Sequence, residues 1–214
     1  VSKYGVGLDT LDLEAARRHN VVVRWTPGVN SQAVAELAVA FMVALSRDII
    51  PLADEVRAGR WPHHRNGRQL SSAVVGILGC GHVGQRVTRI CGAFGARVLA
   101  HDIRTYEAFY RETSVQPVPL ELLLRESDVV TIHVPLDRST RGLIGAAELG
   151  LMKPDALLVN TARGGIVDEG ALKGALLAGQ IAGAAFDVFA EEPPTDPELL
   201  GLRNFIATPH IGGG

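Results

Sequence analysis

The chain has 214 residues, of which 47% are hydrophobic and 5% aromatic, and its formal net charge is −2. This length allows one domain with a sizeable core, and the Val-, Ala- and Leu-rich composition suits buried sheets. The balanced charge, with no long basic run, argues against nucleic-acid binding, because neutralising phosphates requires clustered Lys and Arg. The longest apolar run, residues 37–45, is too short to span a bilayer, so we expect no membrane segment.

The two cysteines, Cys80 and Cys91, lie too close together in the sequence to suggest a disulfide framework or a metal site. We therefore expect reduced thiols, no bound metal and a cytoplasmic protein. No signal peptide is visible. The chain starts at Val1 without a methionine and stops at Gly214 in a glycine-rich turn, which we interpret as a fragment of a longer protein.

The first seventy residues are predicted to contain two helices. Residues 11–19 have helical spacing, residues 21–25 (VVVRW) favour a short strand, and a turn leads into a longer helix over residues 31–47. That helix is apolar on nearly every face, whereas a surface helix normally carries one apolar stripe. We therefore expect one side to be covered by its own sheet and the other by a second subunit.

The polar segment 57–70 contains Trp and Pro and shows no strong periodicity. We interpret it as an arm that reaches across the same subunit interface, which gives a homodimer held by residues 31–70. The alternative is a surface loop beside a buried helix of a monomer, and the sequence leaves it open.

From residue 73 onward, short apolar runs alternate with amphipathic stretches, which is the pattern of a doubly wound α/β fold with a parallel sheet. Asp168 is a plausible N-cap of one helix, and Gly179 lies where its left-handed C-cap belongs. We predict strands at 73–78, 97–101, 128–133, 156–160, 181–186 and 205–208, and helices at 83–94, 119–126 and 169–178, with a shorter turn at 145–150.

The segment AVVGILGCGHVG places Gly79, Gly81 and Gly84 between a predicted strand and a predicted helix. In a dinucleotide-binding turn, the first glycine permits the tight turn, the second lets the backbone approach a pyrophosphate, and the third lets helix and strand pack closely. The helix N-terminus adds free amides and a positive dipole end. Three such glycines also occur in ordinary loops, so the prediction depends on this context.

The next apolar run, ARVLAHD, ends at Asp102, 23 residues after Gly79. An acidic residue about 20 residues into such a unit binds the ribose hydroxyls of NAD and repels the 2′-phosphate of NADP. NAD is therefore the expected cofactor. A solvated strand-end carboxylate is the alternative reading of Asp102, and nearby Arg104 leaves some room for a 2′-phosphate.

Three polar residues follow successive predicted strands: Arg163, Glu192 and His210. Each alone has an ordinary explanation as a surface arginine, a solvated loop acid and a structural histidine. Together, at the carboxyl ends of parallel strands, they provide an anion clamp, a partner for the histidine and a proton donor. That set is what hydride transfer from a nicotinamide to a 2-oxo acid requires.

The sequence resembles the D-2-hydroxyacid dehydrogenase family over nearly every residue, most of all its phosphoglycerate-oxidising members. The resemblance is carried, in the family order, by KYGVGLDTLDLEAARRHNVVVRWTPGVNSQAVAELAVAFMVALSR, VVGILGCGHVG, SDVVTIHVPLDRSTRGLI, VNTARGGIVDEGALKGALLAGQIAGAAFDVFAEEPP and TPHIGG. It implies a Rossmann domain and NAD-dependent hydride transfer between a D-2-hydroxy acid and a 2-oxo acid. The expected pair is 3-phosphoglycerate and 3-phosphohydroxypyruvate.

By this resemblance the catalytic residues are Arg163, Glu192 and His210, and Glu192 is preferred to Glu191 because the family's acid directly precedes the proline. Arg163 would bind the substrate carboxylate and carbonyl, His210 would donate the proton, and Glu192 would keep the imidazole protonated. Residues expected to contact NAD are Gly79, Gly81, His82, Val83, Gly84, Asp102, His133, Thr161, Ala162, Asp187 and Gly212. His82 replaces a common arginine, which weakens one expected pyrophosphate contact.

The resemblance also implies a domain division. Residues 1–10 correspond to a hinge remnant of the substrate-binding domain, residues 11–208 to the NAD-binding domain, and residues 209–214 to the start of the return to the substrate-binding domain. Most of that second lobe has no counterpart here, so we expect the chain alone to turn over substrate poorly.

Other functions stay open. The scaffold also serves glyoxylate or hydroxypyruvate reduction and phosphite oxidation, whereas formate enzymes of the family carry glutamine where Glu192 stands. An NADH-sensing transcriptional corepressor resembles these enzymes and keeps the three residues. A further alternative is an interaction module in which NAD is purely structural.

Overall fold

The computed structural model describes residues 1–3, 7, 11–63 and 67–214, so most of the predicted hinge at 1–10 lies outside the described residues. Its centre is a parallel sheet of seven strands in the order β3-β2-β1-β4-β5-β6-β7. The strands are β1 Val74–Leu78, β2 Arg97–His101, β3 Gln116–Pro117, β4 Val129–Ile132, β5 Leu157–Asn160, β6 Gly183–Phe186 and β7 Phe205–Ala207. The helices are α1 Leu13–Arg18, α2 Ser31–Ser46, α3 Ile49–Arg57, α4 His82–Ala93, α5 Glu107–Thr113, α6 Leu120–Glu126, α7 Ala146–Leu149, α8 Glu169–Leu177 and α9 Pro197–Leu200, with a 3₁₀ turn at Leu70–Ser72.

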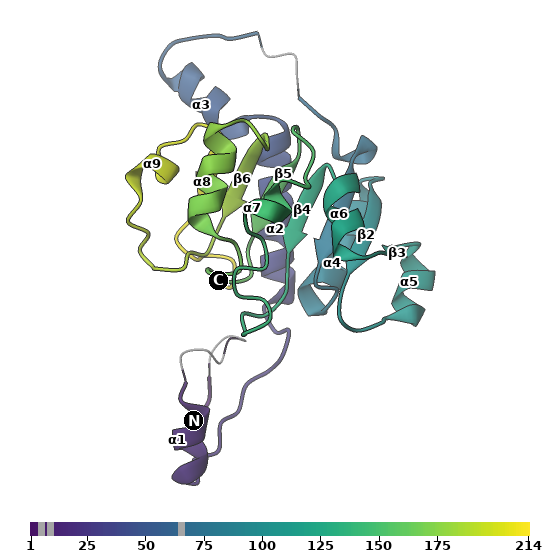
Figure 1. Ribbon diagram of the computed structural model, residues 1–214, viewed down its shortest axis with the longest axis vertical. Coiled ribbons are helices and arrows are strands. Elements are labelled where there is room, and N and C mark those ends of the chain that lie inside the picture. The colour runs from purple at the N-terminus through teal and green to yellow at the C-terminus, as the bar shows by residue number, and fades with distance from the viewer. Residues whose placement is uncertain (4–6, 8–10, 64–66) are drawn as a thin grey trace.

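The helices cover both faces of the sheet (Figure 1). Helices α2, α4 and α5 form one hydrophobic core with it, while α6, α7 and α8 form a second core on the other face. Strands β4, β5 and β6 are buried along their whole length. Double burial explains why these strands are continuous apolar runs rather than alternating ones. The doubly wound α/β fold is confirmed.

Strand β1 is the point from which the sheet winds in two directions. It pairs with β2 on one side and with β4 on the other, and both pairings are parallel. In open α/β sheets, ligands bind at the carboxyl ends of the strands beside this reversal of strand order. Gly79 follows β1 and His133 follows β4, so these two residues flank the expected ligand crevice.

The six strands predicted after residue 73 and the helices between them are confirmed to within one or two residues. Asp168 caps α8 by accepting from the amide of Ala171, and Gly179 has a φ of +64°. The strand predicted at 21–25 is wrong, because only Arg24 pairs, in an isolated bridge with Ser2. Helices α3, α5 and α9 and the two-residue strand β3 are not predicted from the sequence.

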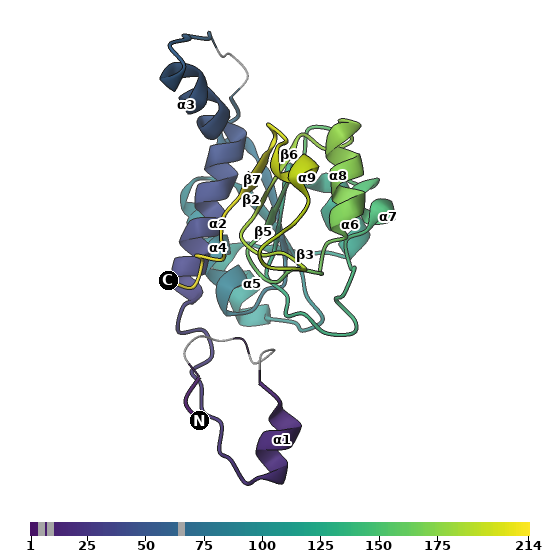
Figure 2. The same ribbon diagram turned by 90° about the vertical axis from the view of Figure 1, so that its left-hand side faces the viewer.

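Two segments extend away from the domain body (Figure 2). One carries α1 and the N-terminus, and the other carries α3 and the chain that follows it. Neither α1 nor α3 contains a buried residue. The predicted arm at 57–70 starts at the last residue of α3, and residues 64–66 within it lie outside the described residues. None of the described helices is long and apolar enough to cross a membrane.

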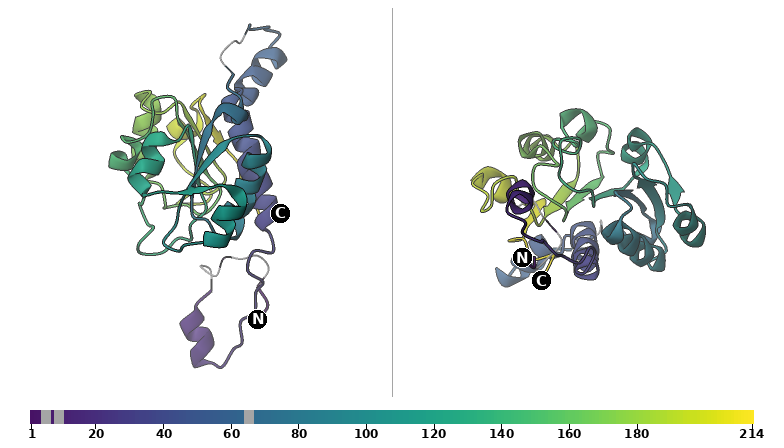
Figure 3. Two further views of the ribbon diagram at one scale, coloured as in Figure 1. Left: turned by 90° about the vertical axis from the view of Figure 1, so that its right-hand side faces the viewer. Right: turned by 90° about the horizontal axis from the view of Figure 1, so that it is seen from below.

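Helix α2 runs along one side of the body, and α3 continues beyond it (Figure 3). Ala35, Ala38 and Val39 are buried in the domain's own core, which confirms the expected cover by the sheet. Ala40 faces the other way and is exposed. A cover on that second side stays a prediction. The sequence suggests Val39 or Val43 as places to introduce a charge that would test this cover. Val39 is 6% exposed and belongs to the core, and Val43 is partly buried, so a charge at either position would also disturb the domain itself.

Candidate active site

The three glycines of the β1–α4 turn have three different environments. Gly79 has a φ of +95°, which favours glycine, and a Cβ there would lie 2.7 Å from the carbonyl carbon of His133. A Cβ on Gly84 would lie 2.0 Å from the carbonyl oxygen of Gly79. A Cβ on Gly81 would meet nothing within 4 Å. The first and third glycines are thus needed by the fold, whereas the second leaves space that a ligand can fill.

The start of α4 borders that space. No side chain caps the helix at Gly81, so its first-turn amides, which include those of His82 and Val83, are available to an anion. The exposed His82 ring lies against the chain that enters α2, because a Cβ on Gly28 would be 2.8 Å from it. Val83 is partly buried and packs against the core.

Asp102 lies just beyond β2 and is held against the glycine turn. Its Oδ2 accepts from the amide of Cys80 at 2.7 Å, and its Oδ1 accepts from the amide of Arg104 at 2.8 Å. An ionised carboxylate has about four acceptor positions, so each oxygen can accept another hydrogen bond. The side chain is thus fixed, partly exposed and able to bind hydroxyl groups.

Two buried polar atoms at the ends of β4 and β5 have no protein partner: Nδ1 of His133 and Oγ1 of Thr161. Such atoms are rare, because buried polar groups are nearly always hydrogen-bonded. The other ring nitrogen of His133 lies 3.0 Å from the hydroxyl of Thr131. Burial lowers the pKa of His133 to about 3, so this ring is neutral and is no proton donor at physiological pH. The orphaned atoms and the open space at Gly81 fit a bound dinucleotide.

Glu192 and His210 form the pair expected from the sequence. Nδ1 of His210 lies 2.9 and 3.1 Å from the two carboxylate oxygens, and the amide of Phe189 donates to Oε1 of Glu192 at 3.0 Å. Partial burial raises the pKa of Glu192, but the hydrogen bonds from His210 and Phe189 and the charges of His210 and Arg163 outweigh it. The pKa of Glu192 therefore lies below its ordinary value, and the carboxylate is ionised at neutral pH.

The backbone at His210 is unusual. Its φ is +54°, and a residue other than glycine in this region costs on the order of 1–3 kcal/mol. The side chain is 46% exposed, so the imidazole is accessible while Glu192 holds Nδ1. Strained backbone of this kind is concentrated at functional sites.

Arg163 follows β5 in a turn that is held by Asn160. The buried Asn160 side chain donates to the carbonyl of Arg163 at 2.9 Å and accepts from the amide of Ala162 at 3.1 Å. The guanidinium donates to the carbonyl of Ala162 at 2.6 Å. Asn160 is not among the site residues predicted from the sequence, although a polar residue at the end of a buried apolar run could have indicated it.

Asp187 follows β6 and is 1% exposed. Its carboxylate accepts from the amides of Ile211 and Gly212, at 2.8 and 2.7 Å, and from the hydroxyl of Thr208. The amide of Gly212, expected near the cofactor, is thus already used within the chain. The structure brings Asp187, Glu192 and His210 together at the ends of β6 and β7.

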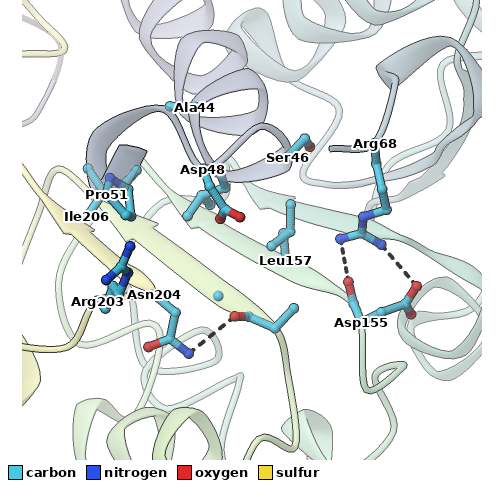
Figure 4. Close-up of a pocket in the computed structure, with 13 residues that line it drawn as sticks. Ala44, Ser46, Asp48, Pro51, Arg68, Asp155, Leu157, Arg203, Asn204 and Ile206 are labelled. Carbon is cyan, nitrogen blue, oxygen red and sulfur yellow. Dashed lines mark hydrogen bonds and ion pairs between the residues drawn. The ribbon is translucent and has the colours of Figure 1, made fainter. Parts of the chain in front are cut away.

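Features elsewhere do not compete with this site. Both cysteines are free, and burial raises the pKa of Cys80 to about 11 and that of Cys91 to about 12, which makes them unreactive thiols. Among the described residues, no group of His, Cys, Asp or Glu side chains could hold a metal. A cavity of about 260 Å³ lies at the amino-terminal edge of the sheet, where Arg68 pairs with Asp155 at 3.0 Å (Figure 4).

The fold and the glycine turn define a dinucleotide-binding α/β domain, and comparison with known proteins agrees. The model of the family "D-isomer specific 2-hydroxyacid dehydrogenase, NAD binding domain" matches residues 39–212. This chain belongs to the D-2-hydroxyacid dehydrogenase family, as part of its NAD-binding domain.

Relatives that are named for different activities are about equally similar in sequence to this chain. The chain is 40% identical to a glyoxylate reductase of Thermococcus litoralis, over 99% of this chain and 66% of the relative. It is 39% identical to a D-3-phosphoglycerate dehydrogenase of Methanocaldococcus jannaschii, over 99% of this chain and 41% of the relative. A D-lactate dehydrogenase of Aquifex aeolicus, crystallised with NAD and lactic acid, superposes with a TM-score of 0.89 at 30% identity, over 99% and 68% of the two chains. This chain thus spans 66% of the length of the glyoxylate reductase and 41% of the length of the phosphoglycerate dehydrogenase.

Proposed function

We propose that this chain is the NAD-binding domain of a two-domain dehydrogenase that interconverts a D-2-hydroxy acid and a 2-oxo acid. The observation that carries the proposal is the Glu192–His210 pair, whose carboxylate also feels the charge of Arg163. These three residues follow β5, β6 and β7, which are neighbours in the sheet. Such a site holds a substrate carboxylate and exchanges one proton with its oxygen.

In this mechanism, bound NAD(H) supplies hydride chemistry, and this chain's residues provide binding and proton transfer. Gly81, Asp102 and Thr161 are the proposed cofactor contacts, together with Gly79, His82, Val83, Gly84, His133, Ala162, Asp187 and Gly212. Arg163 binds the carboxylate of the 2-oxo acid. Protonated His210 donates to the carbonyl oxygen during reduction, and neutral His210 takes the proton back during oxidation. Glu192 orients the imidazole through Nδ1.

Our first candidate for the substrate pair is 3-phosphoglycerate and 3-phosphohydroxypyruvate. Glyoxylate or hydroxypyruvate reduction is the second candidate, because relatives with those names are 40% and 38% identical. The buried thiols suit a reducing compartment, and we place the protein in the cytoplasm. Steady-state turnover of the two-domain protein with a panel of 2-oxo acids and NADH tests the proposal. Absence of turnover with every acid of the panel would favour an NADH-sensing or structural role instead.

Cofactor choice provides a direct prediction. The chain should bind NADH at least about tenfold more tightly than NADPH, a difference of about 1.4 kcal/mol, because the fixed carboxylate of Asp102 repels a 2′-phosphate. Calorimetric titration of both cofactors measures the ratio. Asp102→Asn should reduce it, whereas Glu121→Gln, which neutralises a surface carboxylate on α6, should leave it unchanged. Equal affinity of the unmodified chain for both cofactors would contradict the assignment.

The outer side of α2 is a candidate interface for a homodimer. We propose that two copies of the chain pack through this helix and the segment that follows it. Helix α3 exposes Ile49, Ile50 and Val56, and α2 leaves Ala40 exposed and Val43 partly exposed. Ala40→Glu should give monomers, since a charge would be buried at the contact. Ala147→Glu, at an exposed alanine of α7, is the matched control and should stay dimeric. Light scattering coupled to gel filtration measures the oligomeric state of the unmodified chain and both variants. A monomeric unmodified chain would refute the proposed interface.

A further inference from the structure

The turn that carries His210 is built around the buried carboxylate of Asp187. The amides of the two residues after His210, Ile211 and Gly212, donate to its Oδ1 and Oδ2 at 2.8 and 2.7 Å. The hydroxyl of Thr208, two residues before His210, donates to Oδ1. One carboxylate therefore binds the chain on both sides of the histidine.

This turn needs such a support, because its own backbone does not favour it. His210 has a φ of +54°, which residues other than glycine seldom adopt, and its amide donates to the carbonyl of Thr208 at 3.0 Å. The carboxylate also approaches the backbone closely, since a Cβ on Gly212 would lie 2.9 Å from Oδ2 of Asp187. An ionised acceptor inside the protein makes strong, directional hydrogen bonds, which are suited to hold an unfavourable conformation.

The Glu192 contact depends on the conformation of this turn. Nδ1 of His210 lies 2.9 Å from Oε2 of Glu192, and the amide of Phe189, three residues after β6, fixes the other carboxylate oxygen. Asp187 begins the same segment after β6. The positions of both His210 and Glu192 therefore depend on the segment that follows β6. In this segment, Asp187 holds the turn that carries His210, and the amide of Phe189 holds the carboxylate of Glu192.

We propose that Asp187, together with the hydroxyl of Thr208, is a positioning residue that holds His210 in the conformation that pairs it with Glu192. The catalytic consequence rests on the proposed function, whereas the effect on the histidine ring does not. Oδ2 of Asp187 accepts from the amide of Gly212 and keeps a lone pair that a cofactor amide can use. The positioning role is therefore compatible with the proposed cofactor contact.

Thr208→Val tests this role more selectively than a substitution of Asp187 itself, because valine keeps the shape of threonine and leaves the Asp187 carboxylate in place. Ionised Glu192 can only accept, so the neutral ring of His210 should carry its proton on Nδ1. The ¹⁵N resonances of the His210 ring in this chain report that tautomer. In Thr208→Val the preference for Nδ1–H should be largely lost, and Thr208→Ser, which keeps the hydroxyl, should restore it.

The same variants are then measured in the two-domain protein. Thr208→Val should lower kcat at least about tenfold and leave the Kd for NADH within about twofold, because proton transfer depends on histidine placement and cofactor binding does not. Asp187→Asn should have the larger effect on the ring, since its amide group sets a donor against a backbone N–H. Circular dichroism checks that both variants fold, and if Asp187→Asn does not, Thr208→Val decides.

An unchanged Nδ1–H preference in folded Thr208→Val would overturn the positioning role, whatever the activity. Loss of the tautomer preference with unchanged kcat would show that placement does not matter for turnover, and would overturn the catalytic part. If the unmodified two-domain protein reduces no 2-oxo acid, the proposed function fails, while the resonance measurement still decides the role of Asp187.

Discussion

His210→Ala is expected to lower kcat for 2-oxo acid reduction by the two-domain protein about 10²–10⁴-fold, the usual contribution of a positioned acid or base. The Kd for NADH should change little, because the His210 ring pairs with Glu192 and is not among the proposed cofactor contacts. His133 cannot replace it, since burial lowers the pKa of His133 to about 3 and keeps that ring neutral. Single-turnover kinetics and fluorescence titration measure the two quantities separately.

Glu192→Gln is the companion variant, because it keeps the shape and removes the charge. The neutral amide of glutamine makes a weaker hydrogen bond to Nδ1 of His210 than the carboxylate does, so the imidazole should be held less firmly and kcat should fall for both reduction and oxidation. Steady-state kinetics in the two directions measure the loss, and an unchanged kcat would contradict the assigned pair.

The chain on its own serves as a control for both variants. It contains Arg163, Glu192 and His210, but positioning of substrate within reach of hydride by a second lobe can supply roughly 7–11 kcal/mol of a barrier. We therefore expect it to bind NADH and to turn over 2-oxo acids far more slowly than the two-domain protein. Equal rates would show that the site is complete within these residues.

Gly84→Ala is expected to lower the free energy of unfolding by several kcal/mol. The new methyl group would lie 2.0 Å from the carbonyl oxygen of Gly79, and relieving this clash requires a backbone shift. Gly81→Ala meets nothing within 4 Å, so its free energy of unfolding should stay close to that of the unmodified chain. Its methyl instead fills the space left for the pyrophosphate, and NADH affinity should fall at least about tenfold.

Gly92→Ala provides the matched control within the same helix. It also meets nothing within 4 Å but lies away from the turn, so it should leave NADH affinity unchanged and stabilise the chain by up to about 1 kcal/mol. Urea unfolding and NADH titration of the three variants measure both effects. Unchanged affinity in Gly81→Ala would remove the pyrophosphate from this turn.

The parts of the fold that the sequence predicts are those with a strong local cause. Buried strands such as β4 are continuous apolar runs, and the glycines of the β1–α4 turn have fixed spacing. The run at 21–25 is just as rich in β-branched residues, yet only Arg24 pairs there. Strand preference reflects packing against neighbours more than the backbone itself. Helix α3 was missed although Pro51 lies in its first turn, where proline is tolerated.

The candidate site shows the same limit. Arg163, Glu192 and His210 are recognisable because each is a chemically distinct residue at a strand end. The support beneath them is not, since Asp187 receives its donors from residues more than twenty positions further along the chain. Likewise, the orphaned Nδ1 of His133 becomes evident only when its surroundings are known. Long-range hydrogen bonding depends on the packed fold, and no local pattern encodes it.

The strand order separates two tasks in space. Strands β1, β2 and β4 carry Gly79, Asp102 and His133 in one half of the sheet, while β5, β6 and β7 carry Arg163, Glu192 and His210 in the other half. Within the part of the chain that the structure describes, Asp102 shares no hydrogen-bond partner with Glu192 or His210. Substitutions at Asp102 and at this pair should therefore contribute nearly additively, so the choice between NAD and NADP can change without disturbing the acid–base pair.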